Sequence, residues 1–278
     1  MPAAKKNVPR RPAAAPAQAA KPGQRRAMAR PAEKPQREAV LRNLRRIHGP
    51  RHPAIEAIDV ARVFATYASC LTEWVIANGS RQDELSAELV GDDRCERAIA
   101  LGHGVIIATA HTGGWQMAGR FLRKQHAVDV MIVMQRERDP RAQAMQNAAQ
   151  GRAGVRVAHI GNDPLEALTL LSHLRRRGVV AVQIDRRPPG MRCREVPLFG
   201  QPFSLPEGPL LLAAVSGAPI VPVFTRRVRY MRYEIHVGEP VFVPRKPTAA
   251  QLDAAARATI GAMERFLRDN PTQWFHFE

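Results

Sequence analysis

Val105-Ile106-Ile107-Ala108 is an apolar run, and Ala110-His111-Thr112-Gly113-Gly114-Trp115-Gln116 follows it almost at once. A short β-type run that leads into a histidine, two glycines and an aromatic residue predicts a strand, a tight loop and the start of a helix. This geometry would hold the imidazole of His111 at the mouth of a sheet, where a general base can meet a substrate. A histidine base is expected to have a carboxylate near it, but Gln116, five positions after His111, is an amide.

Downstream of this stretch, apolar runs alternate with helix-like stretches. The alternation predicts an α/β fold, with a mostly parallel central sheet flanked by helices. Residues 230–237 alternate with a period near two and predict a late strand at an edge, and residues 248–268 predict a closing helix with Thr248 as its N-cap. The other expected strands are 105–108, 128–134, 155–159, 179–184 and 220–225, and the helices between them are 115–124, 141–150, 165–176 and 207–216.

The N-terminal part of the chain predicts a tail followed by helices. Residues 1–38 are rich in Ala, Pro, Lys and Arg without apolar periodicity, so we expect a disordered basic tail, and residues 39–278 are expected to form one domain. Helical periodicity marks residues 55–76, and a second helix is expected over 94–101. The helix over 55–76 either packs on the core or rests on a bilayer surface, with Phe64, Tyr67 and Trp74 at the interface.

Composition restricts the class of partner and the compartment. The 278 residues carry 42 Lys and Arg against 25 Asp and Glu, a formal net charge of +17, which favours anionic partners. The three cysteines lie far apart in the sequence and show no CxxC pairing, so a reducing cytoplasm is expected, with neither a disulfide framework nor a zinc site. An apolar run of membrane-spanning length and the apolar stretch of a secretory signal are both absent from the sequence.

Several chemistries lack their sequence signatures. Gly102-His103-Gly104 precedes its strand and lacks the third glycine of a dinucleotide loop. The chain has neither a GxxxxGK[ST] phosphate loop nor a GxSxG nucleophile elbow, and no helical metal-ligand spacing, so no bound metal or cofactor is expected. Nucleic acid is not an expected partner, because the sequence signatures of nucleic-acid-binding modules are absent and aromatic residues make up only 5% of the chain.

Four segments follow one another in the sequence: His111-Thr-Gly-Gly-Trp115-Gln116, Val133-Met-Gln-Arg136, Gln183-Ile-Asp185 with Val196-Pro-Leu-Phe199-Gly200, and Ala218-Pro-Ile-Val-Pro-Val223. Taken in order, they resemble the glycerolipid-type (lysophospholipid) acyltransferases, and most of all their bacterial lipid A late acyltransferase branch, with the first segment resembling the His-X4-Asp/Glu block. Residues 270–276, Asn-Pro-Thr-Gln-Trp-Phe-His, also resemble the ending of that branch. The resemblance covers roughly residues 55–278, and each block alone is weak, whereas the ordered set is specific.

The resemblance implies acyl transfer from an acyl carrier protein or coenzyme A thioester to a hydroxyl or amine of a lipid or glycolipid. His111 would take the proton of the acceptor, and Gly113, Gly114 and Arg136 would stabilise the oxyanion. The resemblance also implies a peripheral protein on the inner, cytoplasmic face of the membrane. Further expected substrate contacts are Trp115, Arg186, Arg187, Phe199 and Gly200, with Phe203 as another candidate for an acyl groove.

The amide at position 116 leaves three alternatives open. Gln116 orients the imidazole as a neutral acceptor. Asp185 or Glu137 supplies the missing charge from an adjacent loop. In the third alternative the site is degenerate, and the protein binds lipid or acyl carrier without turnover. A second arginine cluster, Arg226, Arg227, Arg229 and Arg232, is either an anion site or ordinary solvated surface.

Overall fold

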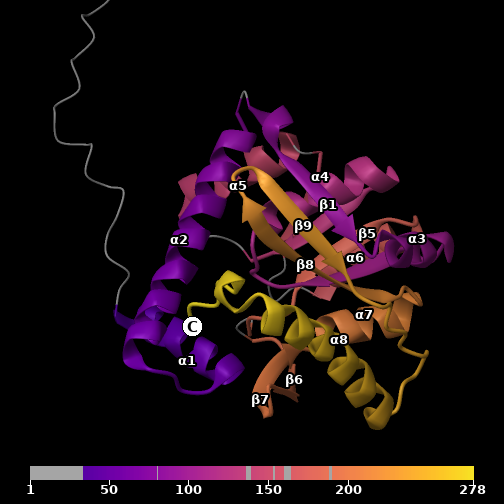
Figure 1. Ribbon diagram of the computed structural model, residues 1–278. Helices are drawn as coiled ribbons and strands as arrows, with labels where there is room; N and C mark the ends of the chain where they lie inside the picture. Colours follow the sequence, from indigo (N-terminus) through magenta and orange to yellow (C-terminus); the bar gives the residue numbers. More distant parts are fainter. Residues whose placement is uncertain (1–33, 80, 136–138, 153, 160–163, 188–189) are drawn as a thin grey trace, which may run out of the picture. The chain divides into compact units, whose positions relative to one another are not determined.

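A computed structural model describes residues 34–79, 81–135, 139–152, 154–159, 164–187 and 190–278 (Figure 1). The helices are α1 (Lys34–His48), α2 (Pro53–Ala77), α3 (Asp92–Ala100), α4 (Trp115–His126), α5 (Pro140–Arg152), α6 (Pro164–Arg175), α7 (Gly208–Ser216) and α8 (Ala249–Asp269), with short 3-10 turns η2 (Gln82–Glu84) and η3 (Pro271–Gln273). The strands are β1 (Ser86–Val90), β2 (Val105–Thr109), β3 (Val130–Met134), β4 (Arg156–His159), β5 (Val179–Gln183), β6 (Cys193–Leu198), β7 (Gln201–Pro206), β8 (Ile220–Arg229) and β9 (Arg232–Val237).

A mixed, mostly parallel sheet forms the centre of the fold. Its strand order is β1-β9-β8-β2-β5-β3-β4, and only the β8–β9 pair is antiparallel. Strands β6 and β7 form a separate antiparallel hairpin. The predicted α/β class with a mostly parallel sheet is therefore confirmed.

Helices cover both faces of this sheet, which explains why β2 is apolar throughout. Ile106 and Ala108 point into a core with α6, α7 and α8, whereas Val105 and Ile107 point into a second core with α3 and α4. A strand buried on both faces has no polar alternation, as expected for the centre of a parallel sheet.

The N-terminal helices α1 and α2 form a third apolar cluster with the end of the chain. Phe64 and Tyr67 on α2 contact Phe277, and Tyr67 also contacts Phe275. Trp74, the third aromatic considered for a bilayer contact, is buried in the same cluster. These three side chains therefore pack on the protein, and the alternative that they face a bilayer is wrong.

The opposite side of α2 is apolar and exposed. Ala54, Ile58, Ala65, Ala68 and Val75 follow one another at spacings that keep them on one stripe of the helix, and all are exposed. Within the described part of the chain, no helix is both long and apolar enough to cross a membrane.

Three expectations about the elements need correction. Residues 34–38, assigned to the tail, form the first turn and beyond of α1, while the rest of the expected tail lies outside the described residues. The late strand β9 is not an edge strand, because β1 pairs with its outer side. The β6–β7 hairpin was not expected, because prolines at 197, 202 and 206 obscure its strands.

Candidate active site

The register of two parallel strands brings His111 and Asp185 together. Strand β2 pairs with β5 so that Thr109 lies opposite Gln183, and both strands end at this same edge of the sheet. His111 and Asp185 each follow two residues later. The Nδ1 atom of His111 lies 2.8 Å from Oδ1 of Asp185, and the backbone N–H of His111 donates to Oδ2 at 3.0 Å.

Asp185 is a buried carboxylate that only accepts hydrogen bonds. Its third donor is the indole Nε1–H of Trp274, at 3.0 Å from Oδ2. Burial raises the pKa of Asp185, but the attraction of His111 and its hydrogen bonds outweigh this effect and hold the pKa well below its ordinary value. An ionised Asp185 requires a proton on Nδ1 of His111, which leaves the lone pair of the neutral ring on Nε2.

The imidazole of His111 is mostly buried but keeps a small solvent-exposed area. Its side chain is 10% exposed, and the ring of Trp115 contacts it edge to face at 5.0 Å between centroids. Among the described residues, Nε2 of His111 has no hydrogen-bond partner. The geometry thus leaves Nε2 of His111 as the ring nitrogen that is available to a substrate.

The last segment of the chain holds the His111 loop in place. Phe275 donates its backbone N–H to the carbonyl of His111 at 2.7 Å, and Gly113 donates to the carbonyl of Gln273 at 3.1 Å. Gln273 also bonds the backbone of Arg227 twice through its side chain, at 2.7 and 2.8 Å. The segment is therefore pinned to both the loop and strand β8.

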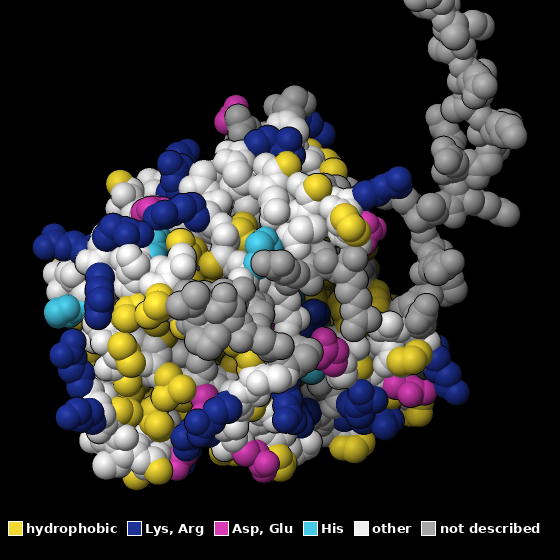
Figure 2. Space-filling model, turned by 180° about the vertical axis from the view of Figure 1, so that it is seen from behind, with side chains coloured by type: hydrophobic (Ala, Val, Ile, Leu, Met, Phe, Trp, Pro, Cys, Tyr) yellow, Lys and Arg dark blue, Asp and Glu magenta, His cyan; other side chains and the backbone are white. Residues whose placement is uncertain are grey.

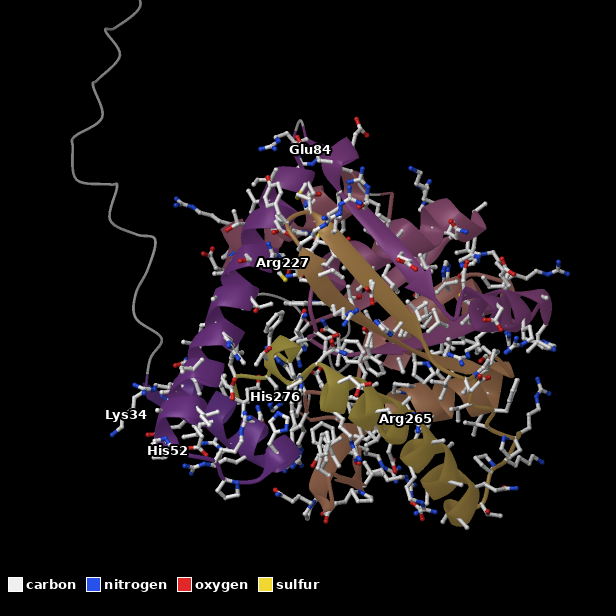
Figure 3. All side chains as sticks on the ribbon, in the orientation of Figure 1. Lys34, His52, Glu84, Arg227, Arg265 and His276 are labelled. Carbon is white, nitrogen blue, oxygen red and sulfur yellow. The ribbon has the colours of Figure 1, made fainter. Side chains whose placement is uncertain are left out.

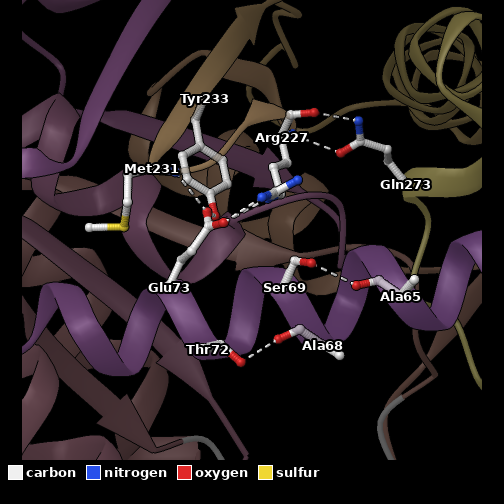
Figure 4. Close-up of polar contacts among 9 residues, drawn as sticks. All are labelled: Ala65, Ala68, Ser69, Thr72, Glu73, Arg227, Met231, Tyr233 and Gln273. Carbon is white, nitrogen blue, oxygen red and sulfur yellow. Dashed lines mark hydrogen bonds and ion pairs between the residues drawn. The ribbon is translucent and has the colours of Figure 1, made fainter.

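A buried ionic cluster fastens α2 to the β8–β9 hairpin (Figure 4). Glu73 on α2 is 2% exposed, and its carboxylate receives two bonds from the guanidinium of Arg227, at 2.9 and 2.6 Å. The backbone of Met231 and the hydroxyl of Tyr233 donate to its other oxygen. Arg226 is likewise paired, with Glu234. The second arginine cluster is thus not an anion site at these two positions.

The structure corrects the expected roles of Gln116 and Gly113, and it shows how Gly114 is packed. Gln116 does not accept a hydrogen bond from the imidazole, since its Oε1 is buried without a hydrogen-bond partner and Asp185 lies on Nδ1. Gly113 cannot donate to an oxyanion because its N–H is already bound to Gln273. Gly114 is packed so closely against Tyr233 and Met117 that an added Cβ would lie 2.5 Å from each.

Four expected substrate contacts have different locations. Phe199 and Gly200 form the turn of the β6–β7 hairpin, where the N–H of Phe199 donates to Glu264 of α8, and their contact with substrate stays a prediction. Nε of Arg186 lies 3.7 Å from Oε1 of Glu278. Arg187 is exposed and lines a cleft beside Asp185. Arg136 and Glu137 lie outside the described residues.

The cleft beside Asp185 has a volume of about 570 Å³. It lies between α1, the loop after β5, strand β7 and the end of the chain, and Figure 3 shows His276 between the α1–α2 pair and α8. Burial lowers the pKa of His276. Nδ2 of Asn43 lies 3.3 Å from Nδ1 of this imidazole. The lining comprises Arg42, Asn43, Arg45, Arg46, Pro50, Asp185, Arg187, Gln201, Pro202, Phe203, Ser204, His276 and Glu278.

Sequence reasoning missed the contributions of α1 and of Trp274 and His276. The resemblance of residues 270–276 to the ending of a known acyltransferase branch is the one signal in the sequence that points to Trp274 and His276. The α1 residues carried no such signal, since they follow the Ala- and Pro-rich tail.

Away from this site, Asp92, Glu96 and His126 place potential metal-ligating atoms within 4.8 Å of one another among the described residues.

Comparison with known proteins identifies sequence relatives of the chain. The sequence model of the family described as "Bacterial lipid A biosynthesis acyltransferase" matches residues 18–278. Two curated relatives, each named phosphatidylinositol mannoside acyltransferase, come from two strains of Mycobacterium tuberculosis and are 27% identical over 139 residues. This match covers 50% of the present chain and 44% of each relative, so it spans less than half of the relatives' length.

Proposed function

The chain belongs to the bacterial lipid A biosynthesis acyltransferase family, and from this premise we propose that it transfers an acyl group from a thioester to a hydroxyl or amine of a lipid or glycolipid. The observation that carries the proposal is the pairing of His111 with the buried Asp185 at 2.8 Å. This pair supplies the charge that Gln116 lacks, so of the three alternatives for the site the geometry favours the second.

In the proposed reaction His111 acts as the general base. Its Nε2 takes the proton of the acceptor as the acceptor oxygen or nitrogen attacks the thioester carbonyl carbon. The C–S bond then breaks, and the proton passes from the imidazolium to the leaving thiolate. Asp185 stays ionised throughout and stabilises the imidazolium, which is the role of the aspartate in serine-protease triads.

The oxyanion needs donors other than Gly113. The backbone N–H groups of Gly114 and Gln116, at the start of α4, have no partner among the described residues. A helix N-terminus favours a negative charge through its free N–H groups and its dipole. We therefore assign oxyanion stabilisation to the first turn of α4, with Arg136 retained as a second candidate.

The acyl donor and the acceptor are proposed by class. The positive net charge of +17 supports an acidic donor, either acyl carrier protein or acyl coenzyme A. The names of the curated relatives support a phosphate-bearing glycolipid acceptor. No bound cofactor is required, because the thioester is itself a substrate.

We also propose that the protein works at the inner, cytoplasmic surface of the membrane. The uncharged stripe of α2 that contains Ile58 and Val75 supports a lipid contact, since apolar burial and attraction to anionic lipid act together at such surfaces. Flotation with anionic vesicles tests this proposal, which predicts that the double change Ile58→Asp and Val75→Asp abolishes flotation. Flotation equal to that of the parent would contradict it.

Transfer assays with purified protein, acyl thioesters and glycolipid acceptors test the chemistry. His111→Ala is expected to lower kcat by about 10²–10⁴, the usual contribution of a general base. Gln116→Glu is expected to give no gain, because Asp185 already supplies the charge. An unchanged rate in His111→Ala would end the base assignment, and a large gain in Gln116→Glu would show that Asp185 does not serve His111.

A further inference from the structure

The cleft beside Asp185 has an excess of positive charge. Arg42, Arg46 and Arg187 line it, and none of the three has a carboxylate within ion-pair distance among the described residues. The fourth guanidinium of the lining, Arg45, is bound to Glu56 on α2. Three guanidinium groups therefore face one concave space without an internal counter-charge.

The carboxylates at the cleft do not neutralise these arginines. Asp185 is fully covered and already receives three N–H groups from His111 and Trp274. Glu278 is paired with Arg186. The charge excess is thus a property of the cleft as it stands.

The guanidinium of Arg46 is held in the cleft by contacts with strand β7. Its Nη2 donates to the carbonyl of Pro202 at 3.1 Å, and its guanidinium lies 5.8 Å from the ring centroid of Phe203. Burial lowers the pKa of this guanidinium, so an anion in the cleft would relieve the cost of holding it there. On the face in Figure 2, Lys and Arg side chains are scattered among apolar ones.

We propose that this cleft binds a phosphate ester of one of the two substrates, with Arg42, Arg46 and Arg187 on the phosphate oxygens. The planar fork of arginine fits phosphate oxygens in pairs. The volume of about 570 Å³ suits a head group or a pantetheine arm and not a lone ion. The inference rests on the proposed function, since Asp185 also lines the cleft. It adds that the cleft binds the phosphate group of a substrate.

Direct binding separates the two sources of phosphate. One probe is coenzyme A, measured by titration calorimetry, and the other is phosphatidylcholine vesicles containing phosphatidic acid. We expect one probe to lose about 10- to 100-fold in affinity in Arg46→Ala and Arg187→Ala, as for a lost charge-assisted hydrogen bond. The exposed Arg257 of α8 has no ion pair in the described part of the chain, so Arg257→Ala is the control of equal charge change.

Two further variants keep the result interpretable. Arg42 is exposed, so Arg42→Ala tests the cleft with little risk to folding, and Arg46→Lys keeps the charge while removing the fork. Loss of coenzyme A binding assigns the cleft to the donor, and loss of vesicle binding assigns it to a phospholipid-type acceptor. Equal losses in Arg257→Ala, or no loss in any cleft variant, would overturn the inference.

Kinetics distinguish a failure of this inference from a failure of the proposed function. The cleft variants are expected to raise KM for the phosphate-bearing substrate with little change in kcat, whereas His111→Ala lowers kcat and keeps binding. Normal turnover with unchanged KM in the cleft variants would refute the cleft alone. Binding that depends on the cleft, without turnover of any thioester in the parent protein, would refute the transferase proposal alone.

Discussion

The change Asp185→Asn tests the central contact of the site. Oδ1 of Asp185 faces Nδ1 of His111, while Oδ2 receives two N–H groups, from the His111 backbone and from Trp274. An asparagine that keeps both of the latter bonds must turn its NH₂ group toward Nδ1. That contact requires an unprotonated Nδ1 and moves the imidazole proton to Nε2.

The expected consequence is a large loss of rate with a small loss of stability. All three hydrogen bonds survive in this orientation, so we expect the melting temperature to change little. The imidazole of His111, the proposed base, is however in the wrong tautomer to accept a proton on Nε2. In serine proteases the corresponding Asp-to-Asn change lowers kcat by about 10⁴, which is roughly 5.5 kcal/mol in the barrier.

The assay is the release of the free thiol from an acyl thioester at saturating acceptor, together with thermal unfolding. Glu195→Gln is a suitable control, because Glu195 is an exposed carboxylate on β6. A rate in Asp185→Asn within tenfold of the parent would refute the reasoning. So would a loss of activity that is fully explained by unfolding at the assay temperature.

Three other changes give separate expectations. Trp274→Phe removes one donor from ionised Asp185, and we expect unfolding measurements to show a loss of about 1.5–3 kcal/mol together with a reduced rate; unchanged stability would contradict this. Gly113→Ala places a Cβ 2.3 Å from a backbone oxygen of β8 at a φ of +46°, so a loss of roughly 2–4 kcal/mol is expected by denaturant unfolding, and a neutral effect would count against the packing. Glu56→Gln should lower the melting temperature near pH 7, because Arg45 lowers the pKa of Glu56 from 4.5 to about 2. This stabilisation is present above pH 4.5 and is lost as pH falls toward 2, so the difference between variant and parent should shrink over that range.

Local patterns in the sequence were enough to predict the layered fold. The runs at 105–108 and 179–184 are apolar at every position or nearly so, as required of strands buried on both faces. Thr248 caps α8 as expected, with Gln251 completing a capping box. Strand β1 was missed because its pairing with β9 joins residues nearly 150 positions apart in the sequence, and no local period records such a contact.

The candidate site was predictable only in part. His111 and Asp185 were both identified, but their contact depends on β2 and β5 being neighbours in register, which the sequence does not state. The bond between Gly113 and Gln273 and the bond between Trp274 and Asp185 link distant segments. Spacing within the loop therefore suggested Gln116 as the partner of His111, although the true partner comes from another strand.

The threading of residues 273–275 across the His111 loop has a consequence for biosynthesis. The ribosome synthesises His111 and Asp185 well before Trp274, and domains fold largely as their segments become available. During that interval the loop lacks the bond from Phe275 and the carboxylate lacks the indole. Until residues 273–275 have been synthesised, a nascent chain therefore lacks two of the hydrogen bonds that hold His111 and Asp185 in the arrangement described above.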